Sequence, residues 1–438
     1  MNVHLVSLGC ARNLVDSEGM LGRLQRAGWH LLEEPDDADV IVVNTCSFIE
    51  SAANESIDTI LALARYKTEG ACRALIVTGC LPERYGEGIG RELPEVDLFL
   101  GTGAFDRIVD AVEGMLADRR CVLPDPDRID LSGPDAPRVQ TLPHSAYLKI
   151  AEGCSRTCTY CIIPKLRGRQ KSRAEGEILT EARRLVDAGT RELILVAQDS
   201  TAYGRDRSGG PGLASLLQRL SDLSNDIWIR VLYGHPESIN EDIIRTMGER
   251  PNICPYFDLP VQHASDRILR RMGRHHTREE LFSLFSQIRE TVPRASLRTT
   301  VIVGFPGETD RDFKTLLSFA EAVRFDHLGA FTYSDADDLP SHRLGGHVSR
   351  AVAEKRRDRL MERQVAISTE KNTAHLGRTL DVLIEESPEP GLYLGRTDFQ
   401  APEVDGLVYV NGQELVLGRF ATVKITDTLE YDLVGDAL

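Results

Sequence analysis

The residues of this sequence best suited to chemistry are three cysteines in one short stretch. The segment EGCSRTCTYCIIP, residues 152–164, places Cys154, Cys158 and Cys161 in the pattern C-x3-C-x2-C. A closed zinc site or an ordinary iron-sulfur cluster takes four ligands, so this set is one ligand short. Three thiolates can instead hold three irons of a 4Fe-4S cubane and leave the fourth iron open to another ligand. The pattern therefore indicates a catalytic cluster.

An open iron of this kind can bind S-adenosylmethionine through its amino and carboxylate groups. One-electron reduction of the sulfonium then releases a 5′-deoxyadenosyl radical, which takes hydrogen from unactivated C–H bonds. A zinc site would need a fourth ligand, and His144 lies away from the motif in a proline-rich stretch. With the aromatic Tyr160 directly before the third cysteine, the motif resembles the signature of the radical S-adenosylmethionine superfamily. This resemblance implies a partial or complete α/β barrel.

Three other cysteines share a position relative to predicted strands. Cys10, Cys46 and Cys80 each directly follow a short apolar strand of an alternating strand–helix pattern, at 3–9, 40–45 and 74–79. Such alternation predicts a parallel sheet, in which the carboxyl ends of the strands line the ligand crevice. We therefore expect these thiols to meet as metal ligands, although a buried core thiol is the alternative for any single cysteine. The remaining cysteines lack this placement and are interpreted as structural: Cys72, Cys121 and Cys254.

The composition is that of an ordinary globular protein. Hydrophobic residues make up 42% and charged residues 27% of the 438 residues, which excludes a disordered or fibrous chain. The nine cysteines are an odd number, and the N-terminal segment is typical of a buried strand rather than a secretion signal, so a disulfide framework is not expected. No stretch approaches the roughly 18 apolar residues of a membrane span. A cytoplasmic protein without membrane contact is predicted.

The chain is predicted to form an α/β protein of several domains. Residues 1–120 form the N-terminal parallel-sheet domain, and residues 121–144, rich in proline and aspartate, form a linker. Residues 145–372 contain six strand–helix units, which predict a TIM-like, partial parallel barrel with its site at the carboxyl ends of the strands. Residues 373–438 contain short β-rich runs between turn residues, which predict a small antiparallel barrel. The six strands expected in the central domain are 145–150, 192–197, 227–233, 255–259, 297–304 and 327–334.

The predicted C-terminal barrel is strongly acidic. Between residues 376 and 438 there are 12 acidic and 4 basic side chains, and the whole chain has a formal net charge of −15. Binding of nucleic acid needs a surplus of Lys and Arg on the docking face, so nucleic acid is not expected as the direct substrate. The barrel should repel RNA and attract a basic partner, unless its acidic face is only a solvated surface.

The order of these parts resembles the methylthiotransferase family of radical S-adenosylmethionine enzymes over nearly the whole chain. The motifs that carry the likeness are SLGCARNLVDSE (7–18), VVNTCSFI (42–49), VTGCLPER (77–84), EGCSRTCTYCIIPKLRG (152–168) and VGFPGET (303–309). The resemblance implies that Cys10, Cys46 and Cys80 hold a second cluster, whose open iron presents the sulfur to be inserted. It further implies two 4Fe-4S clusters and S-adenosylmethionine as cofactors, and a TRAM-like C-terminal barrel that recognises the substrate.

Members of that family modify either an adenosine of transfer RNA or an aspartate β-carbon of the twelfth small-subunit ribosomal protein. The segments PVQHAS (260–265), QDSTAYG (198–204) and APEVDGLVYVNG (401–412) resemble the ribosomal-protein branch; at the first of these the transfer-RNA branch usually has QSGS. Methylthiolation of the aspartate is therefore predicted, with the ribosomal protein, a sulfur donor and a low-potential electron donor as partners. Two alternatives stay open: a transfer-RNA adenosine methylthiotransferase, and a non-catalytic iron-sulfur or zinc module.

The resemblance also assigns six residues to contacts with the cofactor or substrate. Their expected places are the border of the adenine for Tyr160, Ile302 and Gly304, and the methionine moiety or the substrate for Arg173, Gln198 and His263. A local structural hydrogen bond is an equally good interpretation of His263. The segment GFPGET (304–309) lacks the pattern of a phosphate-binding loop, so its glycines are expected to allow a tight turn or the close approach of a ligand.

Overall fold

The structure, a computed structural model, describes residues 1–116, 120–129 and 138–438. Contacts between residues divide the chain into two compact units. The first comprises residues 1–141, 151–157 and 161–177, and the second comprises residues 142–150, 158–160 and 178–438. In the described ranges, no helix is long and apolar enough to cross a membrane.

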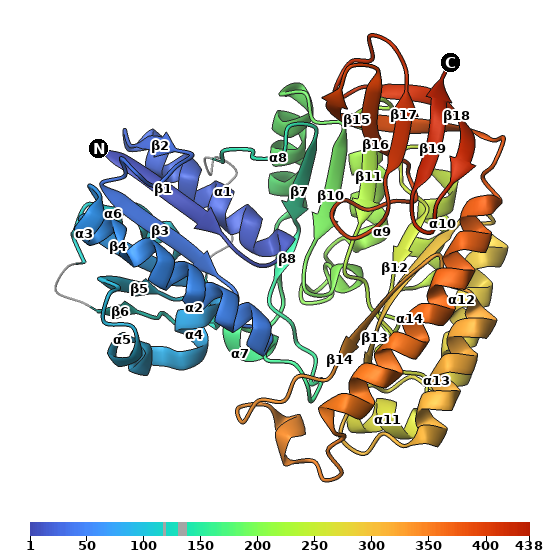
Figure 1. Ribbon diagram of the computed structural model, residues 1–438, viewed down its shortest axis with the longest axis horizontal. Coiled ribbons are helices and arrows are strands. Elements are labelled where there is room, and N and C mark those ends of the chain that lie inside the picture. Colours follow the sequence, from blue (N-terminus) through green and yellow to red (C-terminus); the bar gives the residue numbers. More distant parts are fainter. Residues whose placement is uncertain (117–119, 130–137) are drawn as a thin grey trace. The chain divides into compact units, whose positions relative to one another are not determined.

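The first unit is built on a six-stranded sheet with the strand order β2-β1-β3-β4-β5-β6 (Figure 1). All of its strands run parallel: β1 (Asn2–Ser7), β2 (His30–Leu32), β3 (Val40–Thr45), β4 (Ala74–Gly79), β5 (Leu98–Leu100) and β6 (Cys121–Val122). The strands predicted at 3–9, 40–45 and 74–79 are confirmed as β1, β3 and β4. The short strands β2, β5 and β6 extend the sheet beyond the prediction.

Helices cover both faces of this sheet. They are α1 (Ala11–Arg26), α2 (Glu50–Ala64), α3 (Tyr66–Glu69), α4 (Cys80–Tyr85), α5 (Ile89–Glu92) and α6 (Ile108–Val112). On one face Val42 of β3 belongs to the same core as Met20 and Leu24 of α1. On the other face Ile41 belongs to the core that contains Ile60 of α2. Strand β3 is buried along its whole length, as is typical of a central parallel strand, and its carboxyl end is held between two packed layers.

Two short paired strands close an excursion of the chain that carries the cysteine motif. Strand β8 (Ala151–Glu152) pairs antiparallel with β9 (Lys171–Ser172), and α7 (Ile163–Arg167) lies between them in sequence. The backbone N–H of Cys154 donates to the carbonyl oxygen of Gly168 at 3.0 Å. Gly153 has a φ of +79°, and a Cβ there would lie 2.2 Å from the carbonyl oxygen of Arg169, so only glycine permits this close approach.

The second unit contains a partial parallel barrel. Two three-stranded sheets, in the orders β11-β10-β7 and β12-β13-β14, are joined by a bridge between Ile229 and Ile253. Within the described part of the chain no pairing of β7 with β14 closes the ring, so the predicted partial barrel is confirmed. The six predicted strands are β7 (Ser145–Lys149), β10 (Glu192–Val196), β11 (Trp228–Val231), β12 (Tyr256–Asp258), β13 (Ser296–Val303) and β14 (His327–Thr332).

The helices between these strands have well-defined beginnings. They are α8 (Glu175–Asp187), α9 (Leu213–Ser221), α10 (Glu241–Glu249), α11 (Asp266–Arg271), α12 (Arg278–Thr291), α13 (Asp310–Val323) and α14 (Arg350–Thr373). Capping boxes pair Thr277 with Glu280 at α12 and Thr309 with Asp312 at α13. Each box satisfies backbone donors that a helix start leaves free. The cap at Thr309 therefore fixes the end of the glycine-rich turn that follows β13.

The C-terminal residues form the predicted small barrel, which is closed in the order β15-β16-β17-β19-β18. Its strands are β15 (Thr379–Glu389), β16 (Leu392–Arg396), β17 (Val408–Asn411), β18 (Phe420–Thr428) and β19 (Leu433–Ala437). All pairings are antiparallel except that of β17 with β19. Buried aliphatic side chains fill the interior, among them Val382, Val410 and Ile425.

Buried charges join this barrel to the strands of the partial barrel. Arg396 donates to Glu192 of β10 at 2.6 Å, and Arg230 of β11 donates to the same carboxylate at 2.6 Å. Arg230 also donates to the carbonyl oxygens of Thr397 and Asp398 at 3.3 and 2.9 Å. Burial alone would raise the pKa of Glu192, but Arg396 and Arg230 lower it to about 2. The C-terminal barrel is thus fixed to the second unit by charges that are fully partnered.

The segment predicted as a linker, 121–144, departs from that prediction at its start. Its first two residues pair with Phe99 and Leu100 as strand β6, and Pro126–Arg128 form one 3-10 turn. Two residues are too few for a sequence pattern, so backbone pairing decides their structure. Residues 130–137 of the predicted linker lie outside the described residues. Residues 151–157 and 161–177, expected in the central domain, group by contacts with the first unit.

Candidate functional site

Three of the predicted ligand cysteines lie at the carboxyl ends of three strands of the first unit. Cys10 is the residue before α1, Cys46 directly follows β3, and Cys80 is the first residue of α4 after β4. The strands β1, β3 and β4 are neighbours in the sheet. Cys46 and Cys80 directly follow their strands as expected, whereas β1 ends at Ser7 and Cys10 lies three residues beyond it. The sheet brings the three positions to one edge, and their role as ligands stays a prediction.

Close backbone packing brings the loops that carry these thiols together. A Cβ at Gly9, where φ is +93°, would lie 3.2 Å from the Sγ of Cys46, so glycine lets the end of β1 approach this thiol. The side-chain nitrogen of Asn13 donates to the carbonyl oxygens of Leu8 and Thr45 at 3.0 and 2.8 Å. The hydroxyl of Ser47 donates to the carbonyl oxygen of Cys80 at 2.9 Å. Hydrogen bonds thus tie the loops after β1, β3 and β4 to one another.

The three thiols also act on one another electrostatically. Burial raises the pKa of Cys46 to about 11, and the charges of Cys80 and Cys10 add to this increase. Burial alone would raise the pKa of Cys10, but Arg12 and the backbone N–H of Asn13 lower it to about 7. Burial raises the pKa of Cys80 as well. The charges of Cys80 and Cys10 are thus among the influences on the Cys46 thiol.

The donor set at these strand ends is of a kind that an iron-sulfur cluster takes. Thiolates are soft ligands suited to iron-sulfur clusters, and three of them leave one iron open. A cluster spreads its ligands over several irons, so thiols from three neighbouring strand ends suit it.

The residues of the radical motif lie in the excursion between β8 and α7. Cys154, Cys158 and Cys161 are all partly exposed, and none forms a disulfide. Cys154 is fixed through its backbone to Gly168, as described above. Thr159 is fixed through its backbone N–H, which donates to the carbonyl oxygen of Met272 at 3.0 Å. The loop is therefore held at its beginning and near its second cysteine, while the thiols stay accessible to a cofactor.

Tyr160, between the second and third cysteines of the motif, is held by a buried arginine. The guanidinium of Arg274 donates to the hydroxyl of Tyr160 at 2.8 and 3.2 Å and approaches Nε2 of His235 at 2.6 Å. Burial alone would lower the pKa of Arg274, but Tyr160 and Cys158 raise it above its usual value. Cys158 thus lies within electrostatic range of this cation.

Two of the residues assigned to the adenine share one apolar cluster. Tyr160 and Ile302 pack against the core formed by Ile268, Met272 and Phe305. The rings of Tyr160 and Phe305 meet edge to face, with centroids 6.4 Å apart. This cluster supplies an apolar surface directly beside the cysteine motif, of the kind that a purine ring can cover.

Gly304 and His263 both make local structural contacts. Gly304 has a φ of +77°, and a Cβ there would lie 2.4 Å from the Cβ of Ala353 in α14, so helix packing requires this glycine. Nδ1 of His263 accepts hydrogen bonds from the backbone of Ala264 and Ser265, both at 2.9 Å. Nε2 of His263 lies 3.6 Å from Glu308, and both side chains are fully buried. These contacts favour the local structural interpretation of His263.

The last two predicted contact residues lie in different units. Gln198 follows β10 at the carboxyl end of the partial barrel, where a site of this fold is expected. Arg173 follows β9 and belongs to the first unit. The structure therefore joins Tyr160 and Ile302 in one cluster, and it relates Gly304 to His263 through Glu308, whose carboxylate accepts from the backbone of Gly304.

Sequence reasoning missed two arginines that belong to these sites. Arg167 lies in the first unit beside Cys80, and Arg274 lies in the second unit beside Tyr160. Arg167 is part of the quoted motif EGCSRTCTYCIIPKLRG, six residues after Cys161, so its position in the motif was the available signal. Arg274 follows α11 with no motif around it, and only its burial reveals it.

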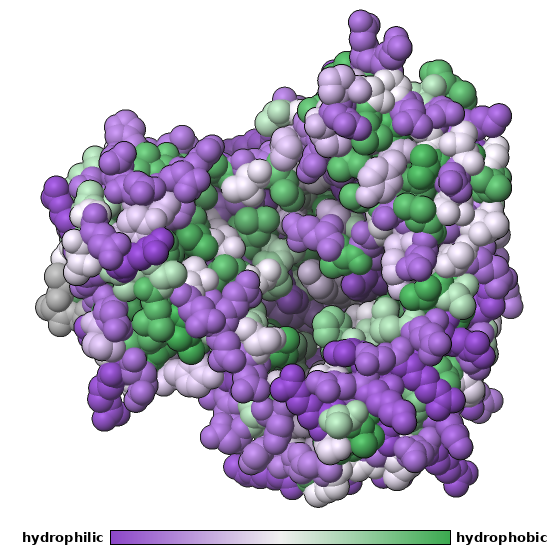
Figure 2. Space-filling model, in the orientation of Figure 1, coloured by the Kyte–Doolittle hydropathy of each residue, from purple (hydrophilic) through white to green (hydrophobic). Residues whose placement is uncertain are grey.

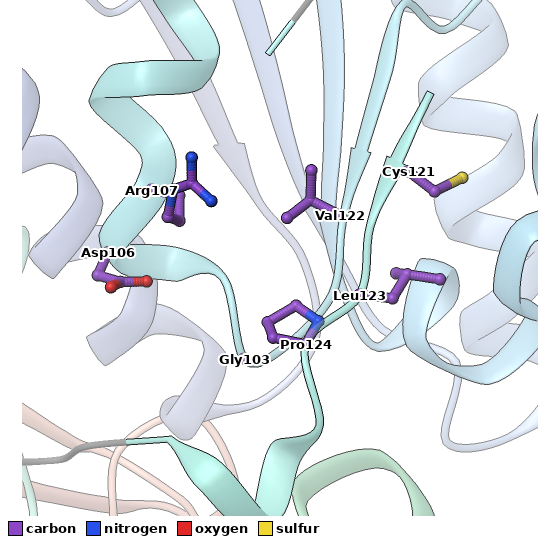
Figure 3. A pocket seen from close by; sticks show the side chains of 7 residues that line it. All are labelled: Gly103, Asp106, Arg107, Cys121, Val122, Leu123 and Pro124. Atoms are coloured by element: carbon purple, nitrogen blue, oxygen red, sulfur yellow. The ribbon is translucent and has the colours of Figure 1, made fainter. Parts of the chain in front are cut away.

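A cavity of about 400 Å³ lies elsewhere in the first unit (Figure 3). Its walls come from the ends of β5 and β6 and from the turn before α6: Gly103, Asp106, Arg107, Cys121, Val122, Leu123 and Pro124. Arg107 is paired with Asp110 at 2.9 Å. The cavity contains none of the six predicted ligand cysteines, so it is not the cluster site.

Comparison with protein families divides the chain into three matches. Residues 2–101 match a family described as "Uncharacterized protein family UPF0004". Residues 148–320 match the radical SAM superfamily, and residues 376–438 match the TRAM domain. The predicted radical domain and the TRAM-like nature of the C-terminal barrel are thereby confirmed.

Two solved structures show the same fold at low sequence identity. The radical S-adenosylmethionine methyltransferase TsrM from Kitasatospora setae, with tryptophan and a SAM analogue bound, aligns with a TM-score of 0.59 at 12% identity over 84% of this chain and 89% of that chain. The cobalamin-dependent S-adenosylmethionine radical enzyme OxsB aligns with a TM-score of 0.52 at 14% identity over 84% of this chain and 57% of that chain. At such identities the likeness concerns the fold alone.

Relatives of known name match the chain from end to end. A "Ribosomal protein uS12 methylthiotransferase RimO" from Desulfosudis oleivorans is 56% identical over 100% of both chains. The proteins of the same name from Clostridioides difficile and Geobacter sulfurreducens are 48% and 45% identical over 100% of this chain and 99% and 98% of theirs. The resemblance to the ribosomal-protein branch is confirmed, and the chain belongs to the RimO family of ribosomal protein uS12 methylthiotransferases.

Proposed function

We propose that this protein transfers a methylthio group to the β-carbon of an aspartate in ribosomal protein uS12 by radical S-adenosylmethionine chemistry. Its similarity to RimO proteins over the full length of both chains is the observation that carries the proposal. The two cysteine sets support it, because the reaction needs both a radical source and a sulfur-presenting centre. A ribosomal substrate would place the reaction in the cytoplasm.

In this proposal Cys154, Cys158 and Cys161 hold the radical cluster. A 4Fe-4S cluster held there would supply the one-electron reduction that radical S-adenosylmethionine chemistry needs. The chain's own contribution is positional. The bonds at Cys154 and Thr159 fix the loop, and the apolar cluster around Tyr160 and Ile302 offers a dry surface for the adenosyl group. Excluding water there protects a reactive intermediate from side reactions.

Cys10, Cys46 and Cys80 hold the second cluster in this proposal. Their arrangement at one sheet edge, with mutual electrostatic effects, supports a shared group rather than three separate thiols. A sulfur donor and a low-potential electron donor are then required as partners, because the chain itself supplies neither sulfide nor electrons. The count of two clusters predicts about eight irons per chain.

The C-terminal barrel supports a basic substrate. Its exposed acidic side chains are Asp381, Glu386, Glu389, Glu403, Glu414, Asp427, Glu430 and Asp436, and its exposed basic ones are Arg378, Arg419 and Lys424. Hydrophilic residues prevail on the molecular face in Figure 2, with small hydrophobic groups between them. A surface with this excess of negative charge attracts a basic ribosomal protein and disfavours an RNA backbone.

The test is a side-by-side reaction on two substrates. The protein is reconstituted anaerobically with iron and sulfide and given S-adenosylmethionine and a low-potential reductant, with either uS12 or transfer RNA. Mass spectrometry is expected to show a methylthio gain on an aspartate of uS12. A gain on adenosine alone would overturn the substrate assignment in favour of transfer RNA.

Metal analysis of the same preparation tests the cofactor count. About eight irons and eight sulfides per chain are expected, and one zinc without sulfide would indicate a non-catalytic zinc module instead. Cys121→Ala is the matched control, because Cys121 lies in the same sheet but outside both sets. This variant should keep the full iron content.

A further inference from the structure

One buried arginine reaches from the radical motif to the N-terminal thiols. Arg167 ends helix α7, which begins two residues after Cys161. It is 2% exposed, although arginine is almost never fully buried unless it is paired. Its Nη2 donates to the Sγ of Cys80 at 3.6 Å, within the range of a hydrogen bond to sulfur. The same nitrogen donates to Oδ1 of Asn13 in α1.

The other half of the guanidinium is held by two carboxylates. Nη1 of Arg167 donates to Asp16 at 2.7 Å and lies 3.4 Å from Glu152. Asp16 belongs to α1, and Glu152 to β8 at the start of the excursion. The planar, forked guanidinium can satisfy these partners and the sulfur at once, which an ammonium cannot do. Arg167 is thus fixed from three sides with one N–H left to face Cys80.

This geometry matters for a sulfur that ligates iron. Hydrogen bonds to the cluster sulfurs and the net charge around them set the reduction potential of iron-sulfur clusters. A bond from a cation to a thiolate is stronger than one between neutral groups, and it stabilises added negative charge. Removing the cation should therefore lower the potential, and removing a carboxylate that offsets it should raise the potential.

We propose that Arg167 is a positioning residue of the N-terminal cysteine site, which orients Cys80 and sets the reduction potential of the cluster held there by a charge-assisted hydrogen bond to its sulfur. The inference rests on the proposed second cluster. It also gives the radical motif a second task, since the segment that supplies Cys161 supplies a contact to a ligand of the other site six residues later.

The test measures the potential of the second cluster by itself. The full-length protein with Cys154, Cys158 and Cys161 all replaced by Ala serves as the parent, so that iron binds only at the N-terminal site. Iron content and an electron paramagnetic resonance redox titration are measured for the parent and for Arg167→Met, Arg167→Lys and Asp16→Asn. Arg169→Met is the matched control, because it removes the same charge from an exposed side chain two residues away.

We expect Arg167→Met to make cluster reduction at least tenfold less favourable, which is a drop of about 59 mV for one electron. Asp16→Asn should shift the potential in the opposite direction, Arg167→Lys should stay closer to the parent than Arg167→Met, and Arg169→Met should match the parent. If Arg167 had only a structural role, the substitutions would alter iron retention or the melting temperature. Arg167→Met and Asp16→Asn would then not shift the reduction potential in opposite directions. If Arg167→Met does not fold, the reduction potential of Asp16→Asn decides the question: a value above that of the parent supports the inference, and an unchanged value contradicts it.

Two outcomes overturn the inference and differ in what else they overturn. If the parent binds about four irons but all variants titrate at its potential, Arg167 does not tune the cluster, and the proposed function stands. If the parent binds no iron, the second-cluster proposal itself is wrong. The same holds if the parent with the added substitution Cys80→Ala still binds its iron.

Discussion

The two cysteine regions differ in how the charge of their buried arginine is balanced. Beside Cys80, Arg167 is paired with two carboxylates, those of Asp16 and Glu152. Beside Cys158, Arg274 donates to Tyr160 and approaches His235, and no ion pair of the described residues includes it. Glu237 also acts electrostatically on Arg274 and raises its pKa, so the two arginines differ in how closely carboxylates approach them. Because the charge near a cluster influences its reduction potential, we expect different potentials for the two proposed clusters.

The largest expected effect separates the chemistry of the two regions. Cys158→Ala removes an expected ligand of the radical cluster, so reductive cleavage of S-adenosylmethionine should fall below detection. Cys46→Ala should instead abolish methylthiolation of uS12 and leave some cleavage, because its thiol belongs to the other set. Chromatography of 5′-deoxyadenosine and mass spectrometry of uS12 check both results. Normal cleavage in Cys158→Ala, or full methylthiolation in Cys46→Ala, would break the comparison.

A smaller effect is expected when Arg274 is replaced. Arg274→Met leaves the partly buried side chain of Tyr160 without this partner, and a lost hydrogen bond to a charged group costs about 1.5–3 kcal/mol. If this cost falls on the reacting state, cleavage of S-adenosylmethionine should slow by roughly tenfold to a hundredfold. Tyr160→Phe should show part of the same defect in initial-rate measurements.

The exposed Arg270, on the same helix α11, provides the control for that comparison. Among the described residues its side chain donates to the carbonyl oxygen of Asp266 one turn earlier and to no group of Tyr160, so Arg270→Met should keep the normal rate of cleavage. An equal loss of rate in Arg270→Met would show that charge on this helix acts in general, and that the contact to Tyr160 has no special role.

A third buried arginine, Arg396, tests whether the effects of replacing Arg167 and Arg274 on the cysteine regions are local. Arg396→Met breaks a buried ion pair with Glu192 and should reduce the free energy of unfolding by about 3–5 kcal/mol in urea titrations. The iron content of either region should not change, because Arg396 belongs to β16 of the C-terminal barrel, which carries none of the six predicted ligand cysteines. Arg378→Met, at an exposed position of the same barrel, should cost much less. Loss of iron in Arg396→Met would show that a buried arginine outside both cysteine regions also affects iron binding, and it would contradict the comparison of the two regions.

The smallest expected effect is a pH dependence that belongs to the barrel and to neither cysteine region. The pKa of Glu192 is lowered to about 2 in the folded protein, so its stabilising contribution is complete above its ordinary value and is lost as the pH falls toward 2. The melting temperature of Glu192→Gln should therefore be lower than that of the unchanged protein at neutral pH. The difference should narrow below about pH 4.5. A constant difference down to pH 3 would contradict the assignment.

Much of this fold could be predicted because its strands are long enough to carry a pattern. β1, β3 and β4 are six-residue strands with mostly apolar sequences, and Cys46 and Cys80 directly follow two of them. In contrast, β5 and β6 have three and two residues, and β6 begins a segment that is rich in proline and aspartate. Their strand structure comes from pairing with neighbours, which no local sequence pattern contains.

The candidate sites were predictable where spacing encodes the chemistry and unpredictable where tertiary contacts do. The pattern of Cys154, Cys158 and Cys161 is local, so sequence alone reveals it. Arg167 and Arg274 gain their importance from burial beside groups that lie far away in sequence, such as Cys80 and Tyr160. For His263 the sequence left a ligand contact and a local hydrogen bond equally open, and the two backbone bonds to its Nδ1 favour the local interpretation.

The buried charges beneath the C-terminal barrel limit how this protein can change its substrate during evolution. Without the barrel, Arg230 would lose the carbonyl oxygens of Thr397 and Asp398, and Glu192 would lose one of its two cations. An uncompensated buried charge is strongly destabilising. Replacing the whole barrel by recombination should therefore destabilise the protein. If the barrel recognises the substrate, new specificity would have to arise on its exposed loops, while the side chains beneath it stay constrained.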